Sequence, residues 1–341
     1  MVKLALLFLL VVAMLPACAP ARRAQSPRMP VSSSADDTVA HVQFILDSQR
    51  PSGAIAMRPD QGVINPYFGN LAARALLRAS GHLLPVQRYM NWYLAHLKPD
   101  GTIDDYHVAD GQEISTGDAD STDSYAATFL SLVAAWIEAG GDSRWVTSNR
   151  EKLDRVSSAI VAVTDRDGLT WAKPGYPRKL LMDNCEVYRG WLDWSRLMSR
   201  QGDHPSAALA HRRSEQVRAA LLSFRQPDGL WGWAITRRGS LVESDGHRFY
   251  PDSVAQVFPL VWGLTDEASG FRAMDAAQPT WRKLQAGDFP WLLTAYAAAL
   301  AGDLESARQA LASIREQHPD LQWPWFVAES AWVIETRRLV R

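Results

Sequence analysis

Cysteine is scarce in this chain, which has only Cys18 and Cys185 among its 341 residues. Cys18 belongs to a processing segment discussed below, so Cys185 has no partner for an intramolecular disulfide, and a Cys/His metal site has no support. An excess of charge is also lacking, because the formal net charge is −1. This balance provides no electrostatic footprint for a nucleic acid. We therefore expect no metal, no cofactor and no nucleic-acid partner.

Two families of catalytic motif are missing as well. The sequence has no glycine-rich phosphate loop and no Gly-x-Ser-x-Gly elbow, so nucleotide chemistry and serine hydrolysis have no support. Its apolar run, residues 4–15, is shorter than the roughly 20 residues that a membrane-spanning helix needs. Lys3 precedes this run and Pro16-Ala17-Cys18 follows it, which is typical of a secretory signal.

The N-terminal segment predicts export and membrane attachment. Leu15-Pro16-Ala17-Cys18 resembles the lipobox of bacterial lipoproteins, which implies that Cys18 becomes a lipidated first residue, although Pro16 replaces the usual small residue. Residues 19–36 are rich in Pro, Ser, Arg and Ala without periodicity, as in a flexible tether. We expect a signal peptide (1–17), a tether (18–36) and one folded domain (37–341). The protein would be anchored by its lipid on the periplasmic side, at the outer membrane.

Short turn markers repeat along the rest of the chain and divide it into helical stretches. One kind contains Pro or Asp before Gly, and the other is a Gly-Asp pair. Because Gly ends a helix in the left-handed conformation and Asp caps the next one, these markers predict alternating helices in six pairs. The markers are Pro51-Ser52-Gly53, Pro99-Asp100-Gly101, Asp165-Arg166-Asp167-Gly168, Pro227-Asp228-Gly229 and Pro319-Asp320, with Gly141-Asp142, Gly202-Asp203 and Gly302-Asp303.

The two helices of each pair differ in composition. The first helices have one apolar stripe, whereas the second helices are apolar almost all round and must be covered on most sides. Six covered helices inside six half-exposed ones describe an all-α fold, the (α/α)6 toroid. The first helices are expected at 37–49, 83–97, 144–164, 204–225, 266–283 and 303–317, and the second at 67–79, 122–139, 183–200, 252–263, 289–301 and 325–339.

This topology directs attention to one end of the barrel. All inner helices would begin at the same mouth, where the connecting loops are long and rich in aromatic residues. Aromatic planes stack on the apolar faces of sugar rings, which predicts a carbohydrate site. The alternative is that the tryptophans only plug the barrel end. The predicted substrate-binding residues of the mouth are Tyr67, Tyr106, Tyr125, Trp171, Trp231, Trp233, His247, Arg248, Tyr250 and Trp325.

Acidic residues gather at the starts of three consecutive inner helices. Carboxylates that meet in a desolvated cleft repel each other, so one of them holds a proton at neutral pH and can act as a general acid. We predict that the catalytic acid and base come from Asp120, Asp123 and Asp183. Asn184, Glu186 and Asp252 are expected to be additional polar groups of the binding site. The alternative is that these residues only cap helices, since Asp183 and Glu186 have the spacing of a capping box.

The chain resembles the six-hairpin glycosidase superfamily over residues 37–341. The resemblance rests on the repeat plan, the aromatic loops and two motifs, residues 120–125 (DSTDSY) and residues 182–188 (MDNCEVY). It implies hydrolysis of a bacterial or environmental oligo- or polysaccharide, with Asp120 or Asp123 paired with Asp183. Two alternatives stay open: a polysaccharide lyase that uses Tyr250, His247, Arg248 and Arg178, and a lipid-tethered glycan-binding or assembly protein without a competent acid/base pair.

Overall fold

The computed structural model describes residues 34–79 and 81–341, and a compact unit spans Thr38–Arg341. The predicted signal peptide (1–17), the lipidation site Cys18 and most of the tether (18–36) lie outside the described residues. Helix α1 (Ser34–Asp47) begins slightly before the predicted domain start at residue 37.

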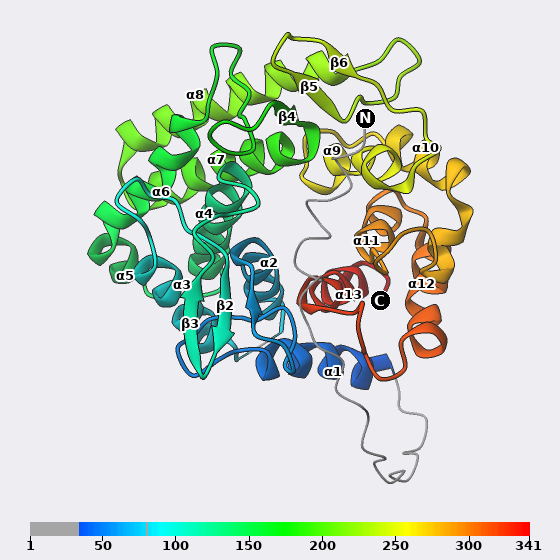
Figure 1. Ribbon diagram of the computed structural model, residues 1–341, viewed down its shortest axis with the longest axis horizontal. Coiled ribbons are helices and arrows are strands. Elements are labelled where there is room, and N and C mark those ends of the chain that lie inside the picture. Colours follow the sequence, from blue (N-terminus) through cyan, green and yellow to red (C-terminus); the bar gives the residue numbers. More distant parts are fainter. Residues whose placement is uncertain (1–33, 80) are drawn as a thin grey trace, which may run out of the picture. The chain divides into compact units, whose positions relative to one another are not determined.

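Within the described residues the helices form six pairs, each with an outer and an inner member (Figure 1). The pairs follow one another along the chain, as the repeated turn markers predict. The outer helices are α1, α3 (Leu83–Ala95), α5 (Ser143–Ser148) with α6 (Arg150–Ala162), α8 (His204–Leu221), α10 (Ser269–Ala277) and α12 (Leu304–Gln317). The inner helices are α2 (Pro66–Leu76), α4 (Asp123–Glu138), α7 (Leu181–Arg200), α9 (Phe258–Val261), α11 (Leu293–Leu300) and α13 (Val327–Leu339).

The inner helices form a closed ring. They contact one another in chain order from α2 to α13, and α13 packs back against α2. Figure 1 looks along the axis of this ring and shows the outer helices around it. The closed arrangement confirms the predicted (α/α)6 toroid.

Helices α4 and α7 form the most tightly packed part of the ring. Nearly every residue of α4 is buried, in agreement with its lack of a polar face. Gly190 of α7 allows the close approach, because a Cβ at this position would lie 2.7 Å from the carbonyl oxygen of Ala127 and 2.8 Å from its Cα. The two helices are therefore closely packed where Gly190 meets Ala127.

The Gly-Asp markers act as predicted at the turns from inner to outer helices. Gly202 and Gly302 have positive φ angles of 77° and 82°. The side chains of Asp203 and Asp303 then accept the backbone N–H of the residue three positions later, which caps α8 and α12. Asp142 caps α5 in a similar way.

Several predicted helices are interrupted. The outer helix expected at 144–164 breaks at Asn149 into α5 and α6, and that expected at 266–283 ends before Pro279, which begins the short helix η3 (Pro279–Lys283). The prediction of one inner helix at 252–263 is wrong: a single π-turn, η2 (Phe249–Ser253), precedes the short α9, whose second residue is Pro259. Proline has no N–H for the helical hydrogen bond of the preceding turn.

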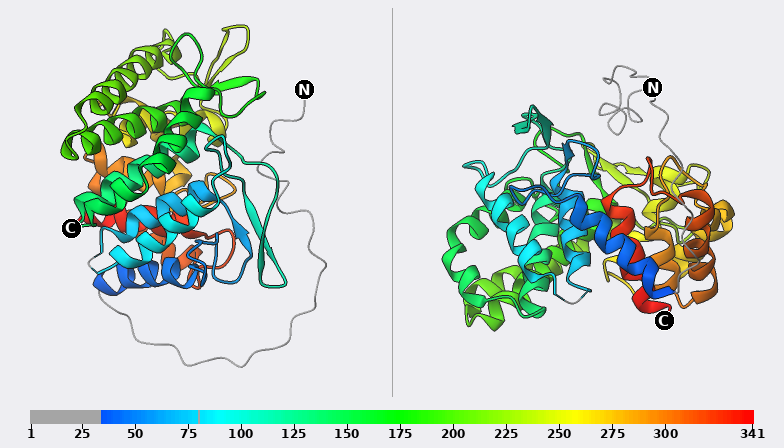
Figure 2. Two further views of the ribbon diagram at one scale, coloured as in Figure 1. Left: turned by 90° about the vertical axis from the view of Figure 1, so that its left-hand side faces the viewer. Right: turned by 90° about the horizontal axis from the view of Figure 1, so that it is seen from below.

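The long loops carry short strands at one end of the toroid, where the inner helices begin (Figure 2). One antiparallel sheet has the order β1 (Val63–Ile64), β2 (Tyr106–Ala109), β3 (Gln112–Ser115), and the other has the order β4 (Arg178–Leu180), β5 (Ala234–Thr236), β6 (Leu241–Val242). A short helix, η1 (Leu222–Phe224), extends α8 toward the same end. We call this end the mouth.

Candidate active site

Helix α7 carries Asp183 and Glu186 near its start. The helix begins at Leu181, and its N-cap residue, Leu180, makes no side-chain capping bond. Asp183 therefore lies inside the first turn and does not occupy the cap position. Asp183 is thus not the N-cap residue of α7.

Asp183 has an unsatisfied oxygen. Its Oδ2 atom is buried and has no hydrogen-bond partner among the described residues. Burial raises the pKa of Asp183 well above its usual range, and the nearby charges of Asp123, Glu186 and Asp120 raise it further. These effects favour the protonated form of Asp183, and its Oδ2 has no hydrogen bond to a described residue.

Asp123, the first residue of α4, is fully buried and fully hydrogen-bonded. Its Oδ1 accepts from the Ser121 hydroxyl (2.6 Å) and the Ser124 backbone N–H (2.8 Å), and its Oδ2 accepts from the Thr170 hydroxyl (2.6 Å). Burial raises the pKa of Asp123 to about 6, although these hydrogen bonds oppose the change. Such an enclosed carboxyl has no access to a ligand, but its charge acts on Asp183.

Glu186 and Asn184 are buried beside Asp183. The hydroxyl of Tyr67, from α2, donates to Glu186 Oε1 at 2.5 Å. Burial raises the pKa of Glu186 to about 8. Asn184 bonds both the N–H and the C=O of Thr170, at 2.8 and 3.1 Å, and so fixes the loop that also supplies a donor to Asp123. Asn184 thus has a structural role in the site.

Asp120 lies just before α4 and stays exposed at the mouth. Surrounding protein atoms desolvate its carboxyl and raise its pKa; Lys173 opposes this effect and Asp118 adds to it. Lys173 is fixed nearby, because its Nζ donates to both carboxylate oxygens of Asp118 at 2.9 and 3.0 Å and to Ala119 O at 2.7 Å. Asp120 is therefore a solvent-accessible carboxyl next to a held lysine.

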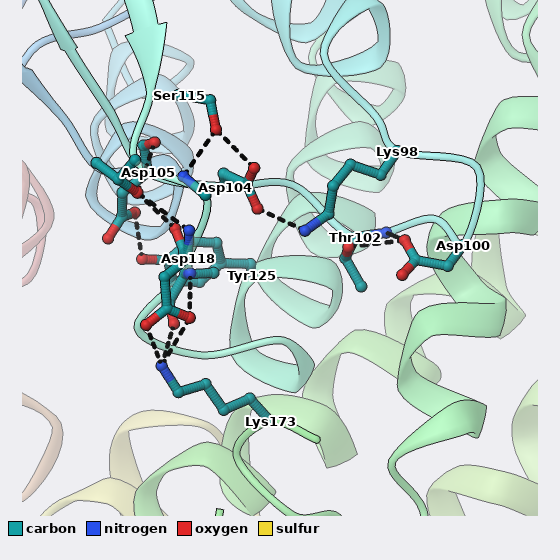
Figure 3. A network of polar contacts seen from close by, with 12 residues as sticks. Lys98, Asp100, Thr102, Asp104, Asp105, Ser115, Asp118, Tyr125 and Lys173 are labelled. Atoms are coloured by element: carbon teal, nitrogen blue, oxygen red, sulfur yellow. Dashed lines mark hydrogen bonds and ion pairs between the residues drawn. The ribbon is translucent and has the colours of Figure 1, made fainter. Parts of the chain in front are cut away.

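A polar network connects this corner to the loop before β2 (Figure 3). The Tyr125 hydroxyl donates to Asp105 Oδ1 at 2.7 Å and accepts from Asn65 Nδ2 at 2.6 Å. Burial and the charges of Asp120 and Asp118 raise the pKa of Asp105 to about 7. Asp105 was not among the predicted site residues, because nothing in its local sequence shows that α4 would meet its loop.

Three tyrosine hydroxyls lie within electrostatic reach of Asp183. They belong to Tyr67 of α2, Tyr176 of the loop before β4 and Tyr250 of η2, and the charge of Asp183 raises the pKa of each of them, after burial as the largest cause. Tyr67 and Tyr250 were among the predicted binding residues, whereas Tyr176 was not. Three repeats thus deliver phenols to one carboxyl.

The other predicted aromatic residues are mostly inside the protein. Trp231, Trp233 and Trp325 are 2%, 4% and 0% exposed, so their rings offer no surface to a ligand. Tyr106 is also buried, at 8%. Trp171 is half-buried, with Lys179 Nζ 4.7 Å from its ring centre. The interpretation that tryptophans plug the barrel end describes the first three.

The predicted residues around η2 form a charge pair at the rim. His247 and Arg248 are exposed, and Arg248 Nε donates to Asp252 Oδ2 at 2.6 Å. Asp252 is 1% exposed. A lyase would use the Arg248 guanidinium to neutralise a uronate. Here that guanidinium is paired with the carboxylate of Asp252.

In the part of the chain that the structure describes, no three His, Cys, Asp or Glu side chains are grouped as metal ligands would be. Over the same residues, no helix combines the length and apolar character that crossing a bilayer requires. The described site therefore consists of carboxyl, phenol and amide groups.

Comparison with known proteins gives a fold. No protein-family model matches the chain, and no curated protein matches it in sequence. Solved structures do: a wild-type glycosidase has a TM-score of 0.65 at 14% identity, with 89% of this chain and 96% of that chain covered. An uncharacterized conserved protein from Thermus thermophilus has a TM-score of 0.65 at 11% identity, covering 89% and 100%.

A third similar structure has a described activity. It is a GH63 mannosylglycerate hydrolase from Thermus thermophilus in complex with glucose, with a TM-score of 0.63 at 10% identity, covering 89% of this chain and 99% of that chain. The chain therefore has the toroid fold of these glycosidase structures over most of its length, as the resemblance in its sequence implied. At such low identity the likeness shows the fold, and the function must be argued from the site.

Proposed function

We propose that this protein is a glycoside hydrolase in which Asp183 is the general acid. The observation that carries the proposal is the buried, unpartnered Oδ2 of Asp183 in a cluster of carboxyls that favours its protonated form. An acid with a free proton at the mouth of a toroid suits the protonation of a leaving group. The glycosidase neighbours of the same fold support this choice over the alternatives.

Asp120 is the proposed base. Its exposed carboxylate can accept a proton from water while the water oxygen bonds to the anomeric carbon. The bond from that carbon to the glycosidic oxygen breaks, and this oxygen takes the proton of Asp183. We expect the two carboxyl groups to face one cleft at about 5–10 Å, the range over which hydrolases of both stereochemical types work. Asp123 then serves as the nearby charge that favours the protonated form of Asp183.

The neighbours suggest a first set of substrates. Two of the similar glycosidase structures hold glucose, and one is a mannosylglycerate hydrolase. We propose that this chain acts on glucosides or mannosides of bacterial or environmental origin. Release of reducing sugar from a panel of α- and β-linked gluco- and manno-oligosaccharides and of glucosyl- and mannosyl-glycerate tests the proposal. No turnover by the purified domain on any of them would contradict it.

A matched pair of variants tests the role of Asp183. Asp183→Asn removes the proton donor and keeps the shape, whereas Asp303→Asn makes the same change at a residue that caps α12 at the opposite end. We expect Asp183→Asn to lose activity and Asp303→Asn to keep it. Equal activity of the two variants would exclude Asp183 from the reaction.

We also propose that the protein is an exported lipoprotein, anchored through Cys18 on the periplasmic side of the outer membrane. The N-terminal sequence alone supports this location. Cys18→Ser should abolish lipid attachment and move the protein from the membrane fraction to the soluble periplasmic fraction. Unchanged membrane attachment would contradict the proposal.

A further inference from the structure

A continuous series of aromatic rings connects five of the six repeats, and both of its ends lie near the acidic cluster. Neighbouring rings have centroids between 4.8 and 6.5 Å apart. We call this series the aromatic arc. In order, its rings are Tyr125, Tyr67, Phe68, Phe326, Phe289, Trp291 and Tyr250.

Both ends of the arc reach the acidic residues. Tyr125 donates to Asp105, and Tyr67 donates to Glu186. At the other end, the charges of Asp120 and Asp183 act on the phenol of Tyr250. A sugar whose glycosidic oxygen meets Asp183 would therefore have the last rings of the arc beside it.

Tyr250 and Trp291 are the part of the arc that solvent reaches most easily near the acid. Their rings stack with centroids 5.3 Å apart and planes 26° apart. Tyr250 is nevertheless 42% exposed, and Trp291 is half-buried. The exposed surface of Tyr250 therefore lies on the side that Trp291 does not cover.

The backbone at Trp291 is unusual. Its φ angle is 55°, in the left-handed region that a bulky residue rarely adopts. Gly287 leaves room for the indole, because a Cβ there would lie 2.9 Å from Trp291 Nε1 and 2.6 Å from the ring of Phe249. A residue that local preferences would not place in this conformation is thus accommodated by its surroundings.

A buried carboxyl holds this conformation. Glu329 of α13 is 3% exposed, and its two oxygens accept the backbone N–H groups of Trp291 (3.1 Å) and Leu292 (2.8 Å). Both bonds fix the turn that leads into α11. An acidic side chain from the last repeat therefore determines where the indole of the fifth repeat lies.

We propose that Tyr250 and Trp291 form a stacking platform for a pyranose ring bound next to Asp183, and that Glu329 is the positioning residue that holds the platform. The proposal rests on the proposed hydrolase function and names a binding subsite of it. The apolar face of the sugar lies on the phenol, whose far side is supported by the indole. The sugar hydroxyls remain available to Asp120, Tyr176 and the other polar groups of the mouth.

Binding to a protein that cannot turn over its ligand separates this proposal from hydrolysis. In an Asp183→Asn background, titration calorimetry would measure the Kd for glucose, mannose, maltotriose and mannotriose. The energy of an aromatic stacking contact corresponds to an increase in Kd of about 3- to 10-fold when the aromatic side chain is removed. We expect this loss for Tyr250→Ala and Trp291→Ala, and a smaller one for Trp291→Phe.

Trp323→Ala is the matched control. Trp323 is 44% exposed at the same mouth, and its ring contacts Phe289 rather than Tyr250. We expect its Kd to equal that of the background protein. If Tyr250→Ala and Trp291→Ala bind as tightly as this control, or if the background protein binds none of the four sugars, the platform is overturned. If the wild-type protein hydrolyses none of the tested glycosides but sugar binding still depends on Trp291, only the proposed hydrolase function is overturned.

Glu329 needs a readout of its own. Glu329→Ala, made in the wild-type protein rather than in the Asp183→Asn background, should raise KM, leave kcat close to that of the parent and change the indole fluorescence. Glu329→Gln keeps a hydrogen-bond acceptor, so its KM should lie between those of the parent and of Glu329→Ala. Near-UV circular dichroism checks that both variants are folded. A lost kcat with unchanged KM in both variants would show that Glu329 acts on the reaction and would overturn its positioning role.

Discussion

The two ends of the toroid use aspartate at helix starts in opposite ways. At the end opposite the mouth, called the closed end below, Asp203 caps α8. Its carboxylate accepts hydrogen bonds from Ser206 and Arg150, and these hydrogen bonds lower its pKa to about 2. At the mouth, Asp183 lies within the first turn of α7, not at the N-cap position and with carboxyls as neighbours, and its pKa is raised. The surroundings, not the residue type or its place near a helix start, decide whether an aspartate holds a charge or a proton.

The largest expected effect comes from removing the proton at the mouth. Asp183→Asn should lower kcat/KM by about 10²- to 10⁴-fold, the usual contribution of a general acid. Because a carboxyl crowded by other carboxyls is replaced by a neutral amide, thermal stability should be unchanged or higher. Steady-state kinetics with a thermal melt would measure both. Loss of activity together with a large fall in Tm would make the effect structural and would erase the contrast with Asp203.

The next effect is a pH dependence that arises at the mouth. Glu186 has a folded-state pKa of about 8 against a usual value of 4.5, so the folded protein binds more protons than the unfolded chain between these values. Its contribution to stability is fully present below pH 4.5 and is lost as the pH rises through 8. With about 1.4 kcal/mol per pKa unit, the free energy of unfolding should fall by several kcal/mol from pH 5 to pH 8.

Glu186→Gln tests the source of that slope. The amide oxygen can still accept from Tyr67 but does not ionise, so the variant should lose less stability than the parent between pH 5 and pH 8. Urea unfolding at several pH values, followed by circular dichroism, would give both slopes. Identical slopes would mean that Glu186 does not titrate with folding.

A smaller effect belongs to the closed end. Asp203→Asn keeps an oxygen that can cap α8 but removes the charge that pairs with Arg150 at 2.6 Å, so it should cost at most about 1 kcal/mol of stability. Activity should be retained, because α8 begins at the end opposite the acid cluster. Urea unfolding at pH 7 and a kinetic assay would check the two statements; lost activity in a stable variant would break the comparison between the ends.

The smallest effect sharpens the comparison within the closed end. Asp303 caps α12 in the same way as Asp203 caps α8. Asp303 accepts the backbone N–H of Ser306 at 3.0 Å, and Asp203 accepts that of Ser206 at 3.1 Å. Asp203 has an additional bond to Arg150. Asp303→Asn should therefore destabilise by a few tenths of a kcal/mol less than Asp203→Asn, as expected for one partly exposed ion pair. Urea unfolding of the two variants side by side measures the difference.

Much of the fold could be predicted from local sequence signals. The Gly-Asp turns and the contrast between striped and fully apolar helices depend on neighbouring residues, so they define the six pairs correctly. The breaks at Pro259 and Pro279 follow from prolines inside the expected helices, whereas the turn at Trp291 depends on a tertiary contact. Trp291 has a left-handed backbone because Glu329, far away in sequence, bonds its N–H group, and no helix pattern contains that information.

The site was predictable only in part, for a related reason. Asp183 and Glu186 stand out because two acidic residues open one apolar helix. Tyr176 comes from the loop that leads into α7, whereas Asp105 and Trp291 come from loops of other repeats, whose positions relative to α7 depend on how the ring closes. Conversely, Trp231 and Trp325 have the sequence context of exposed loop residues, yet are buried because the strands and loops of the mouth pack over them.

The contact that closes the ring has a consequence for the synthesis of the protein. Arg58 Nη1 donates to the carbonyl oxygens of Leu321 and Trp325 at 2.7 and 2.6 Å, and Val327 N donates to Met57 O at 2.9 Å. Helix α2 packs against α4 on one side and α13 on the other. As the polypeptide emerges from the ribosome, α13 is the last helix to be synthesised, so α2 lacks this second neighbour until then. Contacts between residues so distant in sequence form slowly, so we expect the ring to close late in folding. A chain shortened before α13 would leave an open arc of helices, not a smaller working ring.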